Sequence, residues 1–175
     1  MIRKYAILLL VGKDRPGIVD DVASFLFQHG ANLEDSRMAA MGGCFSIMIL
    51  FSCGQDQYEP LRGGLAELRA MGFDAFVHEA EDPEAAPRLA HLPLRLEITA
   101  MDHPGIVRQV VRLLRGHGVN IESLSTEVSH APLSGGPLFG LNLEAGVPAD
   151  RSIARIKKEL EALAEEMNLD LRFVR

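Results

Sequence analysis

The sequence has few of the residues that build redox and metal sites. Its 175 residues include only two cysteines, Cys44 and Cys53, and neither has a second cysteine or a histidine at zinc-type spacing. A metal site is therefore not expected. We interpret the two cysteines as buried thiols of β-strands in a reducing cytosol, with a disulfide or redox pair as the alternative.

The sequence also lacks the short motifs of several enzyme and nucleic-acid-binding classes. It has no G-x-S-x-G motif of serine hydrolases and no Walker-type or dinucleotide-binding glycine motif. The net charge of −6 provides no general attraction to a phosphate backbone, and no helix-turn-helix segment is present. We therefore predict no catalytic residues, no cofactor and no direct contact with nucleic acid.

Long hydrophobic runs are missing as well, apart from one at the N-terminus. The stretch "MIRKYAILLLVGKDR" starts with positive charge and continues with apolar residues, as a signal peptide does. The run is too short to span a membrane, it ends at Lys13, and no A-x-A-like cleavage site follows. We interpret it as a buried β-strand, with a targeting role as the alternative, and predict a cytoplasmic protein with no membrane partner.

The main feature that is present is an internal repeat. Residues 14–34 and 102–122 are identical at 11 of 21 positions, and both segments begin with a D-x-P-G-I-V motif. An offset of 88 residues is too long for a solenoid repeat and matches the length of a small domain. The repeat therefore predicts a duplicated domain.

The joint between the two copies lies in a proline-rich stretch. The segment "EAEDPEAAPRLAHLP" holds three of the nine prolines and has little hydrophobic periodicity, as expected of a linker. We predict a first domain over residues 1–80, a linker over 81–91 and a second domain over 92–175.

Each copy is predicted to have the element order βαββαβ. In the first copy, apolar residues including Val19 follow helical spacing, Gly30 stands where that helix should end, and Gly42-Gly43 suits a hairpin turn. This order is the ferredoxin-like pattern of an α+β fold, an antiparallel sheet with two helices on one face. The expected elements are a strand over 3–12, a helix within 16–30, two strands within 31–52, a helix over 57–71 and a strand over 72–80, then a strand over 93–101, a helix over 105–116, strands over 120–130 and 137–146, a helix over 150–167 and a strand over 169–174.

The two predicted sheets differ on their open faces. The strands "AILLLV" and "CFSIMILF" are apolar at odd and even positions, which is typical of a sheet buried on both faces. The strand "LRLEITA" alternates apolar and polar residues, so the second sheet is expected to have a polar open face. We expect the outer face of the first sheet to be covered in a dimer or by the other domain, with an extended hairpin folded over it as the alternative.

The Pro-Gly pair of the repeated motif suits a strand-to-helix junction. Proline fits the first helical position, and the preceding aspartate can cap the first turn. Glycine leaves the backbone N–H groups of the helix start open to a small anion such as the carboxylate of an amino acid, whose ammonium group an aspartate could bind. The alternative is that the pair only relieves a tight junction. The residues concerned are Asp14, Pro16, Gly17 and Ile18 in the first copy, and Asp102, Pro104, Gly105 and Ile106 in the second.

The segment "KDRPGIVDDVASFLFQHGANLEDSRMAAMGGCFSIMILFS" resembles an ACT domain, a small regulatory module that binds amino acids. Within it, "NLEDSRMAAMGGCFSIMIL" is most similar to the first ACT domain of the glycine cleavage system transcriptional repressor family. The second half, with "GVNIESLSTEV" and an acidic final helix, resembles the second ACT domain of that family. The resemblance spans nearly the whole chain and implies two tandem ferredoxin-like βαββαβ (ACT) domains.

The resemblance also implies a ligand site. ACT domains that bind amino acids hold them between two domains, with the loop before the first helix and a polar residue that opens the second strand. Known ligand-binding loops often have asparagine where this chain has aspartate, and several ACT domains have lost binding. By position, the implied ligand-binding residues are Gly12, Asp14, Pro16, Gly17 and Asn32 in the first copy, and Ala100, Asp102, Pro104, Gly105 and Asn120 in the second.

Three classes of function are compatible with this organisation. The resemblance implies a non-enzymatic regulator that senses a small amino acid, glycine or serine, and modulates transcription of glycine cleavage genes through a protein partner such as a transcriptional activator. We also expect self-association as a homodimer, because the strands of the first sheet are apolar on both faces. The alternative is a regulatory ACT subunit or fragment that controls an amino-acid or folate enzyme. A sheet-based RNA binder is disfavoured because the chain has no tryptophan and only two tyrosines for base stacking.

Overall fold

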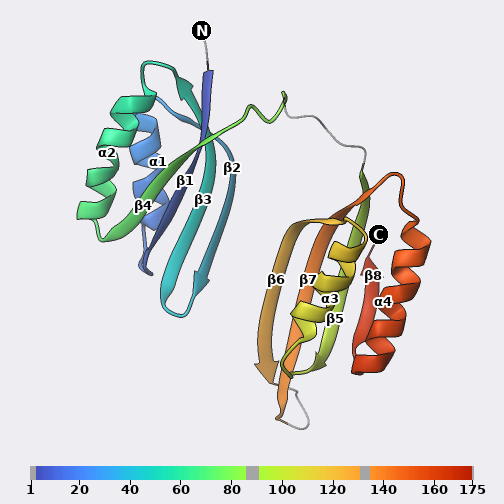
Figure 1. The fold of residues 1–175 in the computed structure, drawn as a ribbon. Coiled ribbons are helices and arrows are strands. Elements are labelled where there is room, and N and C mark those ends of the chain that lie inside the picture. Colours follow the sequence, from blue (N-terminus) through green and yellow to red (C-terminus); the bar gives the residue numbers. More distant parts are fainter. Residues whose placement is uncertain (1–2, 86–90, 131–134, 175) are drawn as a thin grey trace. The chain divides into compact units, whose positions relative to one another are not determined.

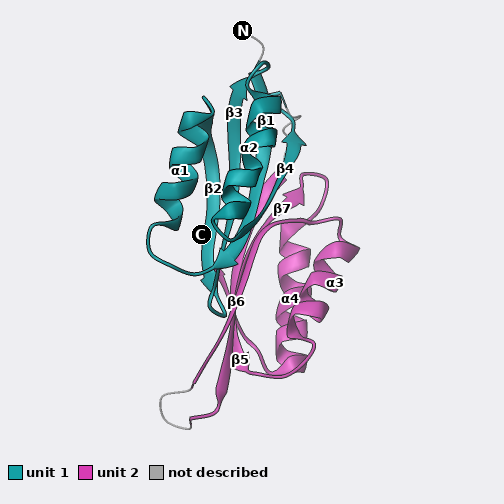
Figure 2. Cartoon of the chain, turned by 90° about the vertical axis from the view of Figure 1, so that its left-hand side faces the viewer, with its two compact units in different colours: residues 1–87 teal, residues 88–175 magenta. Residues whose placement is uncertain are grey.

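The computed structural model describes residues 3–85, 91–130 and 135–174. The chain divides into two compact units, residues 1–87 and 88–175, coloured separately in Figure 2. Part of the predicted linker over 81–91 lies outside the described residues, and the domain boundaries given above stay a prediction.

Unit 1 is a four-stranded antiparallel sheet with two helices on one face (Figure 1). The strand order is β2-β3-β1-β4, so β2 and β4 are the edges. This topology confirms the predicted βαββαβ order. The elements are β1 (Arg3–Lys13), α1 (Ile18–Gln28), β2 (Asn32–Met41), β3 (Cys44–Gly54), α2 (Tyr58–Ala70) and β4 (Phe73–Ala80).

Unit 2 repeats this architecture with the strand order β6-β7-β5-β8. Its last strand is shorter than β4 and pairs only with residues 95–99 of β5. None of the helices in the described ranges is long and apolar enough to cross a membrane. The elements of unit 2 are β5 (His91–Met101), α3 (Ile106–Gly116), β6 (Asn120–His130), β7 (Pro137–Pro148), α4 (Ile153–Met167) and β8 (Asp170–Val174).

The core of each unit lies between the sheet and its two helices. In unit 1, Leu8 and Leu10 of β1 face the helix layer, where Val22 and Phe25 of α1 and Leu61 of α2 are also buried. Removing such side chains from water contributes about 1.5–3 kcal/mol each. Val19, one of the apolar residues at helical spacing, is 47% exposed because the core side of α1 is already filled by its neighbours.

The outer faces of the two sheets differ as the alternation predicted. On sheet 1 the outward residues are mostly apolar, and several are well exposed within the described chain: Leu9, Val11 and Met48 at 41–44% and Phe76 at 62%. Sheet 1 is therefore apolar on both faces but not buried on both. The strands β2 and β3 stay paired in the sheet up to Met41 and Cys44, so their hairpin does not fold over the outer face. A cover from a partner or from the other domain remains a prediction.

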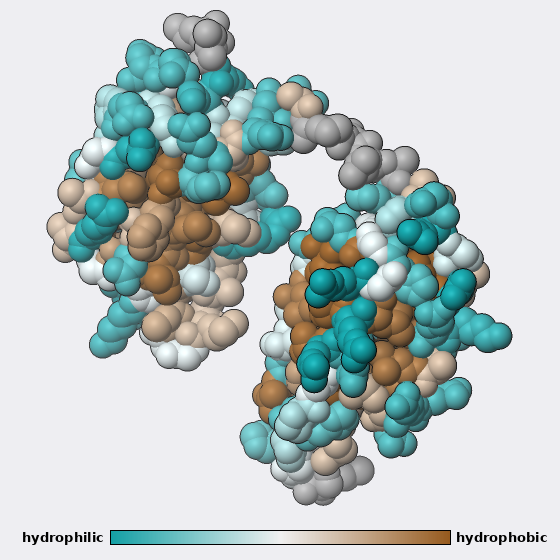
Figure 3. Space-filling model, viewed as in Figure 1, coloured by the Kyte–Doolittle hydropathy of each residue, from teal (hydrophilic) through white to brown (hydrophobic). Residues whose placement is uncertain are grey.

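The outer face of sheet 2 is charged. Arg95 and Glu144 are directly opposite each other on β5 and β7 and form an ion pair of 3.0 Å. Glu97 and Thr99 continue the same face and are exposed. In the view of Figure 3, apolar surface lies in the middle of both units, and hydrophilic side chains cross it in unit 2.

The two cysteines occupy different environments. Cys53 near the end of β3 is buried, and burial raises the pKa of its thiol. Cys44 is exposed, because it opens β3 directly after the Gly42-Gly43 turn, so the expectation that both thiols are buried is wrong for Cys44. Both cysteines are free thiols.

Candidate functional site

The junctions before α1 and α3 differ from the predicted helix start. Each helix is preceded by glycine as its N-cap, with φ of +88° at Gly17 and +105° at Gly105. Pro16 and Pro104 therefore stand before the cap and not at the first helical position. No side chain caps either helix, so the expectation that Asp14 and Asp102 cap the first turn is wrong. The glycine is required because only glycine readily adopts this left-handed conformation.

The loop before each helix is tied to the neighbouring hairpin through the backbone. The N–H of Asp14 donates to the carbonyl of Gly43 at 3.0 Å, and the N–H of Asp102 donates to the carbonyl of Pro137 at 3.0 Å. Both aspartate side chains are exposed. These contacts place the two aspartates at the same end of each sheet as the helix start.

The first loop has an additional restraint that the second lacks. Arg15 forms an ion pair of 2.6 Å with Asp21 of α1, and its guanidinium lies 5.3 Å from the centre of the Phe73 ring. A Cβ atom at Gly12 would collide with the same ring, so glycine makes room for it. In unit 2 the corresponding positions are His103 and Ala100.

The two asparagines lie at the opposite end of each sheet. Asn32 is opposite Ser52, which is opposite Tyr5, whereas Gly12 is opposite Phe45. Seven residues of β1 separate these levels, a distance of about 23 Å at the usual rise of a strand. Asn120 and Ala100 are separated in the same way in unit 2, because Asn120 is opposite Gly146 and Gly146 is opposite Pro93.

The structure therefore divides each set of predicted ligand residues in two. Within a unit, the end of the first strand, the aspartate and the Pro-Gly pair lie together at one end of the sheet. The asparagine lies at the other end. One group contains Gly12, Asp14, Pro16 and Gly17, its counterpart contains Ala100, Asp102, Pro104 and Gly105, and Asn32 and Asn120 stand apart from both.

Asn32 belongs to a polar cluster that the sequence did not reveal. Its amide Nδ2 donates to Oε1 of Glu34 at 3.1 Å, and the hydroxyl of Ser52 donates to the same oxygen at 2.6 Å. Arg3 lies 4.0 Å from this oxygen. The hydrogen bonds from Ser52 and Asn32, with the charge of Arg3, hold the pKa of the Glu34 carboxyl below its usual value. The Glu34 carboxylate thus carries its negative charge at neutral pH, beside the positive charge of Arg3.

A signal for part of this cluster is present in the repeat. Asn32 and Glu34 recur as Asn120 and Glu122, so both pairs stand out in the alignment of the two copies. No feature of the sequence around Ser52 indicates a role in the cluster, because Ser52 reaches Asn32 and Glu34 only through the pairing of β2 with β3. Its equivalent in unit 2 is Gly146, which has no hydroxyl to donate.

The histidine at the end of the first helix of each unit contacts the second helix. His117 Nε2 lies 2.7 Å from Oε2 of Glu159 on α4, and His29 Nε2 lies 3.9 Å from Glu67 on α2. Hydrogen bonds from Arg155 and His117 lower the pKa of Glu159. These pairs connect the two helices of a unit and lie on the helix layer.

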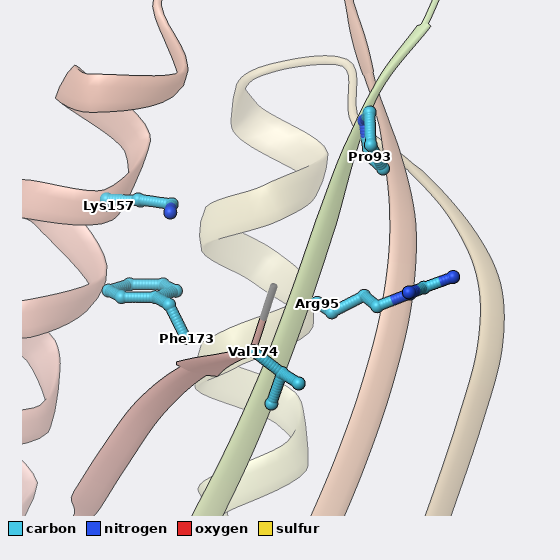
Figure 4. Close-up of a pocket in the computed structure, with 5 residues that line it drawn as sticks. All are labelled: Pro93, Arg95, Lys157, Phe173 and Val174. Atoms are coloured by element: carbon cyan, nitrogen blue, oxygen red, sulfur yellow. The ribbon is translucent and has the colours of Figure 1, made fainter.

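A cavity of about 460 Å³ opens at the edge of unit 2 where β8 is short. Figure 4 shows Lys157 of α4 above the ring of Phe173, and Arg95 directed away from them. The Lys157 ammonium is 4.6 Å from the centre of that ring. The cavity lies between β5, β8 and α4, and none of the predicted ligand residues lines it. This cavity is therefore not the predicted ligand site.

The chain is similar to known proteins over nearly its whole length. The ACT domain family matches residues 4–78 and again residues 94–165. The glycine cleavage system transcriptional repressor of Escherichia coli is 26% identical over 166 residues, which cover 94% of this chain and 86% of that protein. Phosphoserine phosphatase SerB2 of Mycobacterium tuberculosis is 27% identical over 96% of this chain, but over only 40% of its own length.

Solved structures have the same fold. The structure of a protein from Galdieria sulphuraria superposes with a TM-score of 0.83 at 28% identity, and the match covers 98% of both chains. Together with the family matches, this likeness confirms the predicted tandem of two ferredoxin-like domains.

Proposed function

This chain belongs to the ACT domain family, and on that premise we propose that it is a non-enzymatic regulator that senses a small amino acid, with glycine as the first candidate. We further propose that it modulates transcription of glycine cleavage genes by contacting a DNA-binding regulator. The similarity to the glycine cleavage system transcriptional repressor over 94% of the chain supports this function. The two ACT matches span most of the chain, and no catalytic motif was found in the sequence.

The observation that carries the proposal is the division of the ligand residues between the two ends of each sheet. A zwitterion has an anionic and a cationic end, and each sheet offers a helix N-terminus at one end and a polar asparagine at the other. In one unit these groups are about 23 Å apart, too far for a small amino acid. Two ACT domains are therefore needed to complete one site.

An antiparallel arrangement of two ACT domains side by side brings the groups together. The edge strand β2 and the neighbouring helix α1 form one border of unit 1, with Val19 and Phe27 of α1 exposed at 47% and 81%. If a second domain lies along that border in the opposite direction, its helix start meets the Asn32 end of the first sheet. Val19 and Phe27 supply exposed apolar surface on α1 for such pairing.

Ligand binding at a shared site provides the regulatory step. An amino acid that contacts both domains stabilises their paired arrangement relative to the unpaired one. This shift changes the affinity for a protein partner only if the partner binds the paired and unpaired arrangements differently. The partner is expected to be a protein, because the chain is acidic and has no DNA-binding helix pair.

The test of this function is made in cells and with the purified chain. Deleting the gene should raise the level of glycine cleavage transcripts when glycine is scarce. Re-expression of the wild-type chain should return these transcripts to their original low level. Affinity capture of the tagged chain should recover a DNA-binding regulator whose binding changes with glycine. Unchanged transcripts together with no such regulator would overturn the proposal.

The alternative is a regulatory role on an enzyme of amino-acid or folate metabolism. The similarity to a phosphoserine phosphatase over 96% of this chain favours it, because regulatory ACT segments can be part of enzymes or act on them. The same capture experiment separates the two functions, since a metabolic enzyme in place of a DNA-binding regulator would support the alternative.

A further inference from the structure

We infer that Glu34 is the group that recognises the ammonium of the ligand, so that the site of unit 1 selects amino acids over other small carboxylic acids. This inference rests on the proposed amino-acid-sensing function and names a group that the ligand residues deduced from the sequence do not include. Glu34 acts together with Asp14, whose exposed carboxylate lies beside the helix start and reaches the shared site only from the second domain.

The position of Glu34 is set by an irregularity in β2. The pairing of β2 with β3 shifts between Leu33 and Asp35, so Glu34 is an extra residue with no partner across the ladder. Such a bulge redirects a side chain relative to regular strand geometry. The carboxylate of Glu34 thereby reaches Ser52 and Asn32, which face each other on the adjacent strands.

The carboxylate is held from beneath by a buried hydroxyl. Ser52 is only 2% exposed, and its hydroxyl donates to Oε1 of Glu34 at 2.6 Å. A hydrogen bond from a buried donor to an ionised acceptor is among the stronger ones in a protein. Glu34 is therefore fixed in place, while about a third of its side chain, 30%, remains open to solvent.

The cluster presents acceptors to the outside. Asn32 donates its amide Nδ2 to Glu34, and its carbonyl Oδ1 is an acceptor. Within the described residues, the hydrogen bonds and the ion pair of Glu34 all involve Oε1, and Oε2 is the second acceptor. Two acceptors, one of them ionised, suit an ammonium group and repel a carboxylate.

Unit 2 does not reproduce this arrangement. Gly146 replaces Ser52, and a Cβ atom there would lie 2.8 Å from Oε1 of Glu122 and 2.9 Å from Nδ1 of His91. The space that the serine side chain uses in unit 1 is thus taken by Glu122 and His91. Glu122 provides a matched control, since it occupies the same place in the repeat without the hydroxyl beneath it.

The inference is tested by titration calorimetry on the full chain with two probes. Glycine and glycolate share the carboxylate, but glycolate has a hydroxyl in place of the ammonium. We expect the wild type to bind glycine and to bind glycolate at least about tenfold more weakly, because a hydrogen bond to a charged group contributes to that extent. Glu34→Gln should weaken glycine binding about tenfold to a hundredfold and leave glycolate unchanged, whereas Glu122→Gln should change neither.

The outcomes separate the inference from the proposed function. Glycine binding that is unaltered in Glu34→Gln, or equal losses for glycine and glycolate, overturns the inference and leaves amino-acid sensing intact. A wild type that binds none of glycine, serine and alanine overturns both. If Glu34→Gln does not fold, Ser52→Ala keeps the charge but releases the carboxylate, and it should weaken glycine binding severalfold; no change in that variant also overturns the inference.

Discussion

The two units share one topology and one strand-to-helix motif, but they differ on the outer faces of their sheets and beneath the Asn32 cluster. Sheet 1 has Leu9 on its outer face where sheet 2 has Glu97 at the equivalent position. Ser52 beneath the Asn32 cluster becomes Gly146. The helix-start glycine, in contrast, has a positive φ in both units. The two units therefore share the backbone conformation at the helix start, whereas the outer faces of their sheets have diverged.

The largest expected effect concerns the strand end before the loop. Gly12→Ala places a Cβ atom against the Phe73 ring, and overpacking of this kind costs about 1–3 kcal/mol of unfolding free energy. Unit 2 has alanine at the equivalent position, so Ala100→Gly should change stability less. Hydrogen exchange resolved by residue should show the loss of protection in unit 1 only. Equal losses of protection in both units would contradict this account of Gly12.

The next effect should be the same in both units. Gly17→Ala and Gly105→Ala each force a side chain into the left-handed region, which costs about 1–2 kcal/mol per residue. Thermal unfolding of the two single variants should therefore show shifts of similar size. If only one of the variants is destabilised, the shared backbone requirement is wrong.

A third comparison exchanges the outer faces. Leu9→Glu gives sheet 1 the residue type that sheet 2 has. If the cover is a second copy of the chain, we expect this change to weaken dimerisation by about tenfold, since a buried charge without a partner is costly. Sedimentation velocity over a range of concentrations measures this change. Glu97→Gln on the charged face is the control and should leave association unchanged. Identical sedimentation of Leu9→Glu and wild type would show that the face is not a dimer interface.

The smallest effect is in the acid range. The pKa of Glu34 is lowered in the folded chain by the hydrogen bonds from Ser52 and Asn32, so its contribution to stability is present above its unfolded pKa and is lost as pH falls through the folded value. Urea unfolding between pH 7 and pH 3 should therefore show a shallower acid loss in Glu34→Gln than in the wild type. A Glu34→Gln curve parallel to the wild type would contradict the assignment.

The element order was predictable from the sequence because it depends on local patterns. Helical spacing around Val22, the glycine turn at Gly42 and Gly43, and the duplicated motif together predicted every described element to within a few residues. The helix start was less predictable. Which of Pro16 and Gly17 is the cap depends on the backbone angle that the tight junction demands, and composition alone does not report that angle.

The candidate site was predictable only as a set of residues. The separation of Asp14 from Asn32 follows from the parallel direction of β1 and β2, each paired antiparallel to β3, and this direction emerges from long-range strand pairing. Ser52 could not be found because its role depends on register, and Glu34 reaches it only through a bulge. The exposure of Cys44 likewise follows from its place beside the turn.

The central claim is that an amino acid is bound by residues from opposite ends of the sheet, supplied by two ACT domains. Isothermal titration of glycine, and then serine, into the purified wild type, Asp14→Ala and Asn32→Ala tests it most directly. The account predicts saturable binding by the wild type that is lost in both variants while each remains folded by circular dichroism. Binding that survives both substitutions, or no binding of any small amino acid by the wild type, would contradict it.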